Sequence, residues 1–130
     1  MRSHSGLHTI FDSKAADGVG LVFFSSDYSK VELNLDTIAD TDGTIKFYVS
    51  DAEFNPDFSA AQDEDNAFYP AQVVDIEDMT PIDGDTGITP AGIVHKKLIL
   101  NVNGARWVNA IISGMSSGAY TLKCRGYNEP

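Results

Sequence analysis

The sequence has one cysteine, few basic residues and no long apolar run, and each scarcity excludes a class of protein. Because Cys124 is the only cysteine, an internal disulfide and a zinc site built from cysteines are both impossible. No apolar stretch approaches the ~20 residues of a membrane-spanning helix. The polar segment Met1 to Ser5 also lacks the apolar core of a secretory signal. We therefore expect synthesis in a cytoplasm and no membrane partner.

Positive charge is scarce too, since nine Lys and Arg stand against 19 Asp and Glu, for a net charge of −10. Binding of nucleic acid through phosphate contacts needs clustered Lys and Arg, and here only Lys96 and Lys97 are adjacent. Docking onto anionic lipid is disfavoured for the same reason. The acidity suits solubility, or attachment to a partner that carries a basic patch.

Strand patterns are plentiful. Polar and apolar residues alternate strictly over 30–36, and alternation resumes over 45–50 after a loop that contains Asp40, Asp42 and Gly43. A period of two is the signature of a half-buried strand. We predict that the two segments pair as a hairpin, with Val31, Leu33 and Leu35 meeting Ile45, Phe47 and Val49 across the pair.

The C-terminal third predicts three further strands, over 97–102, 106–112 and 120–125. Asn103–Gly104 between the first two is a strong hairpin signal, and a Ser/Gly-rich turn separates the last two. We predict consecutive antiparallel pairing of these strands, with Tyr120, Leu122 and Cys124 facing inward.

The N-terminal part predicts strands over 7–11 and 19–24 with a turn at 16–18. The run 21–24 is apolar without alternation, which indicates a strand covered on both faces, by the second sheet and by a partner subunit. Residues 1–6 have no packing signal, so we expect an N-terminal arm that a neighbour orders.

The middle of the chain, residues 51–93, is irregular and interrupted by four prolines. A capping-box pattern at 59–62 predicts one short helical turn. Residues 72–76 read as a strand, and 83–87 as a long turn of the kind that often carries contacts.

Seven to nine short strands without an amphipathic helix predict an all-β fold, an antiparallel two-sheet sandwich or jelly roll with long loops in the middle of the chain. A small closed barrel is the alternative. At 130 residues, we expect one β-sandwich domain over 1–130.

Signatures of catalysis and of cofactor binding are missing. The sequence contains no nucleophile-elbow motif, and His4, His8 and His95 are not spaced like a metal triad. We expect no cofactor and no enzyme activity, although the abundant acids leave a small jelly-roll hydrolase or lyase as an alternative. Asp83 and Asp85, in a loop-rich acidic stretch, are candidate calcium ligands, against the simpler interpretation of a solvated loop.

Aromatic residues raise a second alternative, a carbohydrate-binding module on a tail or fibre appendage, since flat rings stack on sugars. Trp107 lies within an apolar strand, where a core role is favoured. We expect Tyr28, Tyr48 and Tyr69 to be the exposed stacking candidates.

The segments 101–108 and 118–123 resemble the ending of small β-sandwich virion proteins of tailed bacteriophages. In those proteins an N-V-x-G turn leads to an aromatic-bearing strand, and a Ser/Gly turn then leads to a final strand of the form T-apolar-K. The strand around Phe47, the segment 56–58 and the stretch 73–78 are similar too. The resemblance covers about two thirds of the chain.

The resemblance implies a virion component, made in the host cytoplasm and assembled into a capsid decoration, head-fibre or tail-associated position. We expect a capsid decoration (cement) protein that stabilises the shell through non-covalent contacts with the major capsid protein or other virion proteins. It also implies a homo-oligomer, with a trimer favoured. The expected contact residues combine aromatic character with loop positions: Phe23, Tyr28, Tyr48, Phe58, Tyr69 and Arg106.

Overall fold

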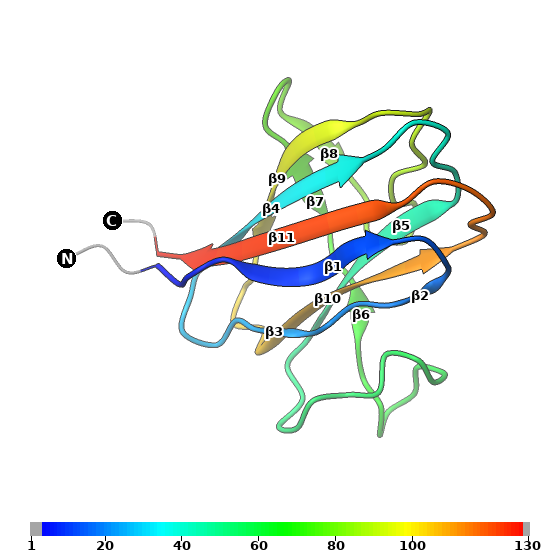
Figure 1. Ribbon diagram of the computed structural model, residues 1–130. Coiled ribbons are helices and arrows are strands. Elements are labelled where there is room, and N and C mark those ends of the chain that lie inside the picture. Colours follow the sequence, from blue (N-terminus) through cyan, green and yellow to red (C-terminus); the bar gives the residue numbers. More distant parts are fainter. Residues whose placement is uncertain (1–3, 129–130) are drawn as a thin grey trace.

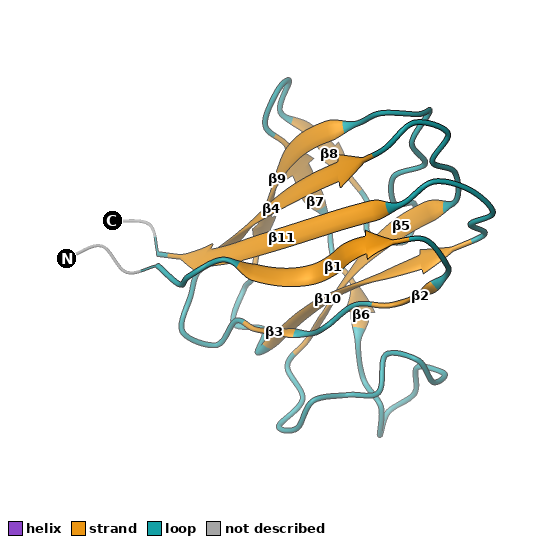
Figure 2. Cartoon of the chain, viewed as in Figure 1, coloured by secondary structure: helices purple, strands orange, loops and turns teal. Residues whose placement is uncertain are grey.

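The computed structural model describes residues 4–128, in which strands and loops account for the whole fold and no helix forms (Figures 1 and 2). None of these residues therefore makes a helix able to cross a membrane. The strands are β1 (His8–Lys14), β2 (Gly18–Val19), β3 (Phe23–Phe24), β4 (Lys30–Thr37), β5 (Thr44–Ser50), β6 (Tyr69–Pro70), β7 (Val73–Asp75), β8 (Thr80–Ile82), β9 (His95–Asn101), β10 (Trp107–Ser113) and β11 (Tyr120–Tyr127).

Two antiparallel sheets face each other and confirm the predicted all-β sandwich. Sheet A has the order β1-β11-β4-β9-β7-β8, and sheet B has the order β2-β10-β5-β6, with β3 also paired to β10. The long strands β4 and β11 lie at the centre of sheet A, and β10 lies at the centre of sheet B (Figure 1). The edge strands are short, as for β8, β2 and β6, or irregular, as for β1 with its two register shifts, which are features that blunt pairing with another chain.

The core lies between the sheets and is made by the inward positions of the alternating strands. Leu33 lies between Cys124 of β11 and Leu98 of β9, and all three side chains are buried. Phe47 and Ile45 enter the same core from sheet B. Each fully buried Leu or Phe contributes about 1.5–3 kcal/mol relative to an exposed one, so the period-two segments hold the two layers together.

The predicted hairpins are wrong, although the strands that form them are right. Segments 30–36 and 45–50 become β4 and β5, which belong to opposite sheets and face each other across the core. The three C-terminal strands also alternate between sheets: β9 and β11 both pair with β4, whereas β10 pairs with β5. Alternation defines which face of a strand is buried, but a partner beside the strand and a partner opposite it produce the same pattern.

The Asn103–Gly104 signal illustrates the same distinction. Both residues have positive φ, 52° and 82°, and the Ala105 N–H donates to the Val102 carbonyl at 3.0 Å. This is the predicted tight turn. Its arms nevertheless leave for different sheets, because the Val102 N–H donates to Ser29 O and the Arg106 N–H donates to Ser50 O. The turn therefore carries the chain across the sandwich.

Two predictions for irregular segments are also wrong. Residues 59–62 form no helical turn, because the Asp57 side chain accepts hydrogen bonds from the N–H and hydroxyl of Ser59. The predicted single strand over 19–24 is broken into β2 and β3. In the run 21–24, Leu21 is 66% exposed and Phe24 48% exposed within the chain, so the predicted cover of this face by a partner subunit stays a prediction.

The N-terminal arm is predicted for residues 1–6, of which residues 1–3 lie outside the described part of the chain. His4 forms a β-bridge with Tyr127, and Ser5 donates its N–H to the Gly126 carbonyl at 2.9 Å. The described part of the segment thus runs along the end of β11, within this chain (Figure 1).

Candidate functional site

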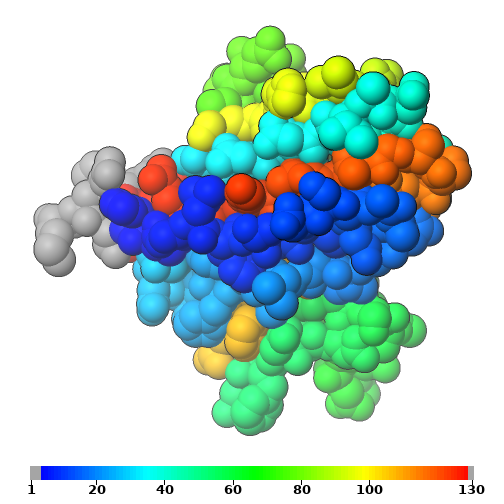
Figure 3. Space-filling model, in the orientation of Figure 1, coloured from blue at the N-terminus to red at the C-terminus, as the bar shows by residue number. Residues whose placement is uncertain are grey.

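The segment 51–68 leaves the end of β5 and folds over the outer face of sheet B, where it projects from the sandwich (Figure 3). Ser50 donates its hydroxyl to the Ala67 carbonyl, and the Trp107 indole N–H donates to the Ala52 carbonyl at 3.0 Å. Trp107 is therefore covered from outside sheet B, and its predicted place in the central core is wrong.

Two of the predicted contact residues, Phe58 and Tyr48, pack where segment 51–68 meets sheet B. Phe58 is only 5% exposed and packs on Phe68, with ring centroids 4.8 Å apart. Tyr48 is half-buried, its ring 5.5 Å from that of Phe68 in an edge-on arrangement. Burial raises the pKa of Tyr48, with the nearby Asp85 carboxylate adding to the effect. Both rings hold the segment against the sheet and offer little surface to a partner.

Phe23 and Tyr28 are a second internal pair. Phe23 is 7% exposed, and its ring lies 6.1 Å from that of Tyr28 in a stacked arrangement. Tyr28 is half-buried and covers Gly126, where an added Cβ would lie 2.3 Å from a Tyr28 ring carbon. The predicted contact role of Phe23 is thus replaced by a core role, and Tyr28 closes the end of β11.

Exposed apolar side chains occur instead at the β2–β3 margin of sheet B and in the neighbouring segment 51–68. Phe24 rests edge-on against Trp107, with centroids 5.1 Å apart. Phe54, two residues beyond the Ala52 carbonyl that Trp107 contacts, is 78% exposed. Leu21 precedes β3 on the same edge. We call Leu21, Phe24 and Phe54 the apolar edge; the run 21–24 without alternation indicated the first two in the sequence, whereas no pattern indicated Phe54.

Arg106, the last of the predicted contacts on this side, is exposed and directly precedes Trp107. Its carbonyl accepts the Ser25 N–H at 2.7 Å, which fixes the backbone beside the apolar edge. The cation therefore borders the apolar side chains. The adjacent segment 51–68 contributes six acids and no Lys or Arg, so the surroundings of the edge are predominantly acidic.

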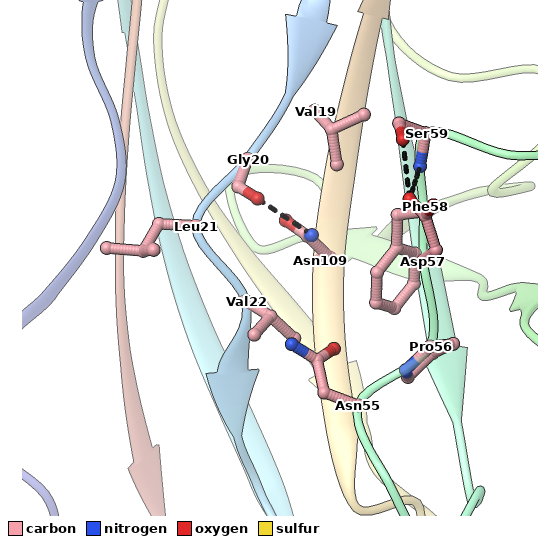
Figure 4. Close-up of a pocket in the computed structure, with 10 residues that line it drawn as sticks. All are labelled: Val19, Gly20, Leu21, Val22, Asn55, Pro56, Asp57, Phe58, Ser59 and Asn109. Atoms are coloured by element: carbon pink, nitrogen blue, oxygen red, sulfur yellow. Dashed lines mark hydrogen bonds between the residues drawn. The ribbon is translucent and has the colours of Figure 1, made fainter.

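A small cavity of about 280 Å³ separates this segment from β2 and β3 (Figure 4). Most of its polar groups already have partners: Asn109 donates its amide to the Gly20 carbonyl at 2.9 Å, and Asp57 accepts from Ser59. The cavity lies between segment 51–68 and sheet B, and it brings no reactive groups together.

Residues 4–128 bring together no group of side chains that would support the metal-binding or the catalytic alternative. No three His, Cys, Asp or Glu side chains gather there as a metal-binding group. Asp83 accepts a hydrogen bond from the Gln72 amide at 3.3 Å, and its carbonyl accepts the Thr86 and Gly87 N–H groups, which closes the predicted turn. Asp85 lies in the same turn without a third carboxylate.

The three histidines lie apart and have separate partners. His8 places Nε2 2.8 Å from the Leu21 carbonyl, whereas His95 places Nδ1 2.7 Å from Asp36 Oδ1. Cys124 is fully buried, and burial raises the pKa of its thiol to about 12. None of these groups therefore forms a nucleophile and base pair.

Tyr69 is the one predicted stacking residue that stays open to solvent, at 52% exposed. It lies on β6, at the side of the sandwich away from β2 and β3. It lies next to a groove formed by β9 and the β6–β7 crossing.

This arrangement of two sheets is the fold of phage-derived β-sandwich proteins. No family model matches the chain, and no curated protein matches it by sequence. Among solved structures, it is similar to the SPBc2 prophage-derived protein YomS, with a TM-score of 0.72 and 11% identity over 98% of this chain and 95% of that one.

The second similar structure is the PBSX exported protein XepA, with a TM-score of 0.73 and 11% identity. The match covers 97% of this chain but 38% of XepA, so the chain corresponds to a part of that protein. At this level of identity the likeness establishes a shared fold. It confirms, at the level of the fold, the resemblance to small β-sandwich phage proteins.

Proposed function

We propose that the protein is a structural component of a bacteriophage particle, and specifically a capsid decoration protein that acts by contact and without catalysis. The fold shared with phage-derived proteins supports this proposal. The observation that carries it is the apolar edge, where Leu21, Phe24 and Phe54 are exposed on an acidic molecule.

The apolar edge has the composition of an attachment site. Protein interfaces place a few aromatic anchors at the centre and polar groups around them. Here Phe54 and Phe24 are the anchors, and the acids of segment 51–68 surround them. Charge complementarity then assigns the partner a shallow apolar depression bordered by Lys or Arg, on the outer surface of the major capsid protein.

A ligand that binds only the assembled lattice stabilises it by mass action. A decoration protein that bridges shell subunits therefore raises the temperature at which the shell dissociates. We also propose that the protein is a homo-oligomer, with a trimer as the first expectation. The candidate subunit contact is formed by Ile38 and Ile93, which are 58% and 64% exposed and are brought together by the hydrogen bond from Thr37 N–H to Val94 O.

Co-sedimentation with shells that lack this protein tests the proposal. Wild-type protein is expected to bind the shells saturably, and Phe54→Ser or Phe24→Ser to weaken binding by at least about tenfold. Ile76→Ser is the matched control, since Ile76 is 41% exposed but lies on β7's side of sheet A. Binding that is absent, or equally strong for all variants, contradicts the proposal.

A carbohydrate-binding module remains the second candidate, because one predicted stacking residue, Tyr69, is exposed. The structure of its surroundings carries a separate inference.

A further inference from the structure

We propose that a groove along the β6–β7 side of the sandwich binds a short oligosaccharide. This inference goes beyond shell attachment and rests on different residues. The groove lies where β9 ends and where the chain crosses from β6 in sheet B to β7 in sheet A. Its volume of about 530 Å³ is that of a small-molecule site.

Carboxamide side chains dominate the polar lining. Gln72, Asn101 and Asn103 are all exposed and border the groove. Each carboxamide carries two donor hydrogens and one acceptor oxygen in a plane. A sugar hydroxyl also donates and accepts, so neighbouring hydroxyls on a ring match such a group. Three carboxamides around one groove, which Lys30 also borders, therefore fit a polyhydroxylated ligand better than an apolar molecule.

These amides have hydrogen-bonding capacity to offer. Within the described residues, the Asn101 and Asn103 side chains make no hydrogen bond, and Gln72 makes one long contact of 3.3 Å, to Asp83. Asn103 also has a backbone role, because its φ of 52° suits the turn with Gly104. Asn101 is an outward-facing strand residue with no such role, and its amide is directed to solvent beside the groove.

An aromatic face completes the set. Tyr69 borders a second hollow that shares Val49, Val102 and Asn103 with the groove, so the two hollows form one continuous surface. Tyr69 combines a flat ring with 52% exposure, whereas the other stacking candidates, Tyr28 and Tyr48, are held against Phe23 and Phe68. A sugar ring stacked on Tyr69 would border the surface that the carboxamides line.

Titration of ¹⁵N-labelled protein with cellotetraose, maltotetraose and chitotetraose, followed by amide chemical shifts, tests the site directly. We expect at least one of these probes to produce saturable shifts centred on residues 69–72 and 101–103. If none of the three binds saturably, or if the shifts centre on the cavity between 19–22 and 55–59, the proposal is wrong.

Variants distinguish binding at the groove from nonspecific binding elsewhere. Tyr69→Ala, Asn101→Ala and Asn103→Gly are each expected to weaken binding about tenfold, and glycine at 103 keeps the turn conformation available. Phe54→Ala and Asn55→Ala are matched controls, an exposed aromatic and an exposed amide outside the groove, and they should bind as the wild type does. Equal affinity of all five variants overturns the proposal.

The two proposals fail independently. Groove variants should co-sediment with shells as the wild type does, whereas the Phe24 and Phe54 variants should keep their oligosaccharide affinity. Loss of both functions in one folded variant would contradict the separation of the two sites.

Discussion

Lys96 reaches from β9 to Asp75 of β7, with Nζ 2.7 Å from Oδ2, at the inner margin of sheet A. Asp75 is only 5% exposed, and its other carboxylate oxygen accepts the Glu77 N–H at 3.1 Å. The pair fixes the end of the short strand β7 to β9. It is a polar counterpart to the apolar contacts that hold the rest of the sheet.

Removing the cation alone should destabilise the protein. We expect Lys96→Met to lower the free energy of unfolding by about 1–3 kcal/mol, because it leaves a buried carboxylate without its charged donor. The double variant Lys96→Met with Asp75→Asn should recover part of that loss. Urea unfolding of the four proteins measures the coupling, and additive single effects would contradict it.

The same pair makes stability depend on pH. The hydrogen bond from Lys96 holds the pKa of Asp75 below its ordinary value of 3.8. A carboxyl whose folded pKa is depressed stabilises the fold above its unfolded pKa, and this contribution is lost as the pH falls through the folded value. The free energy of unfolding of the wild type should therefore fall more steeply than that of Lys96→Met as the pH is lowered from about 5 to about 2.

Asp42 provides a second acid-sensitive contact, at the end of the sandwich that joins β4 and β5 to β11. Its carboxylate accepts hydrogen bonds from the hydroxyl and N–H of Ser116 and from the N–H of Ser117, and these lower its pKa to about 2. Asp42→Asn should lower the melting temperature at pH 7, and the difference should shrink between about pH 4 and pH 2. Asp40→Asn, an exposed neighbour, is the control and should change neither.

Cys124 should be inert in the folded protein. Its side chain is fully buried between Leu33 and His8 in the register of sheet A, and burial raises its thiol pKa to about 12. Because the thiolate is the reacting species, a disulfide reagent such as DTNB at pH 8 should modify it only after denaturation. Rapid stoichiometric labelling of native protein would show that β11 opens.

Gly84 marks a close approach that no other residue fits. A Cβ there would lie 2.3 Å from the Ala71 carbonyl oxygen and 2.5 Å from that of Phe47. Gly84→Ala should cost about 3 kcal/mol, since the obstacles are backbone atoms that must move. Gly6→Ala, which meets nothing within 4 Å, is the control in the same urea experiment.

The inward faces of the strands could be predicted from sequence because alternation is a local property. Val31, Leu33 and Leu35, and likewise Tyr120, Leu122 and Cys124, are buried as predicted. The strand partners could not be predicted from sequence, because the alternation is the same whether an apolar face meets a strand in its own sheet or in the opposite one. The crossing at Asn103–Gly104 depends on backbone bonds to Ser29 and Ser50, which are distant in sequence.

The candidate sites were predicted less well for a related reason. Aromaticity selected Phe23, Tyr48 and Phe58, but packing of segment 51–68 and of β3 buries or half-buries these rings. The groove assembles side chains from 69–72 and 101–103, two segments that are brought together only by the sheet order. Of the groove residues, Tyr69 was among the predicted contacts, where it was chosen for its aromatic ring and loop position.

The copy number of this chain in phage particles purified from the source culture is the measurement that tests the proposed virion role. Quantitative mass spectrometry on density-purified particles would count it against the major shell protein. We predict a copy number comparable to that of the shell protein. Absence from the particles would contradict a structural role in the virion, and a few copies per particle would contradict capsid decoration in favour of a tail or fibre position.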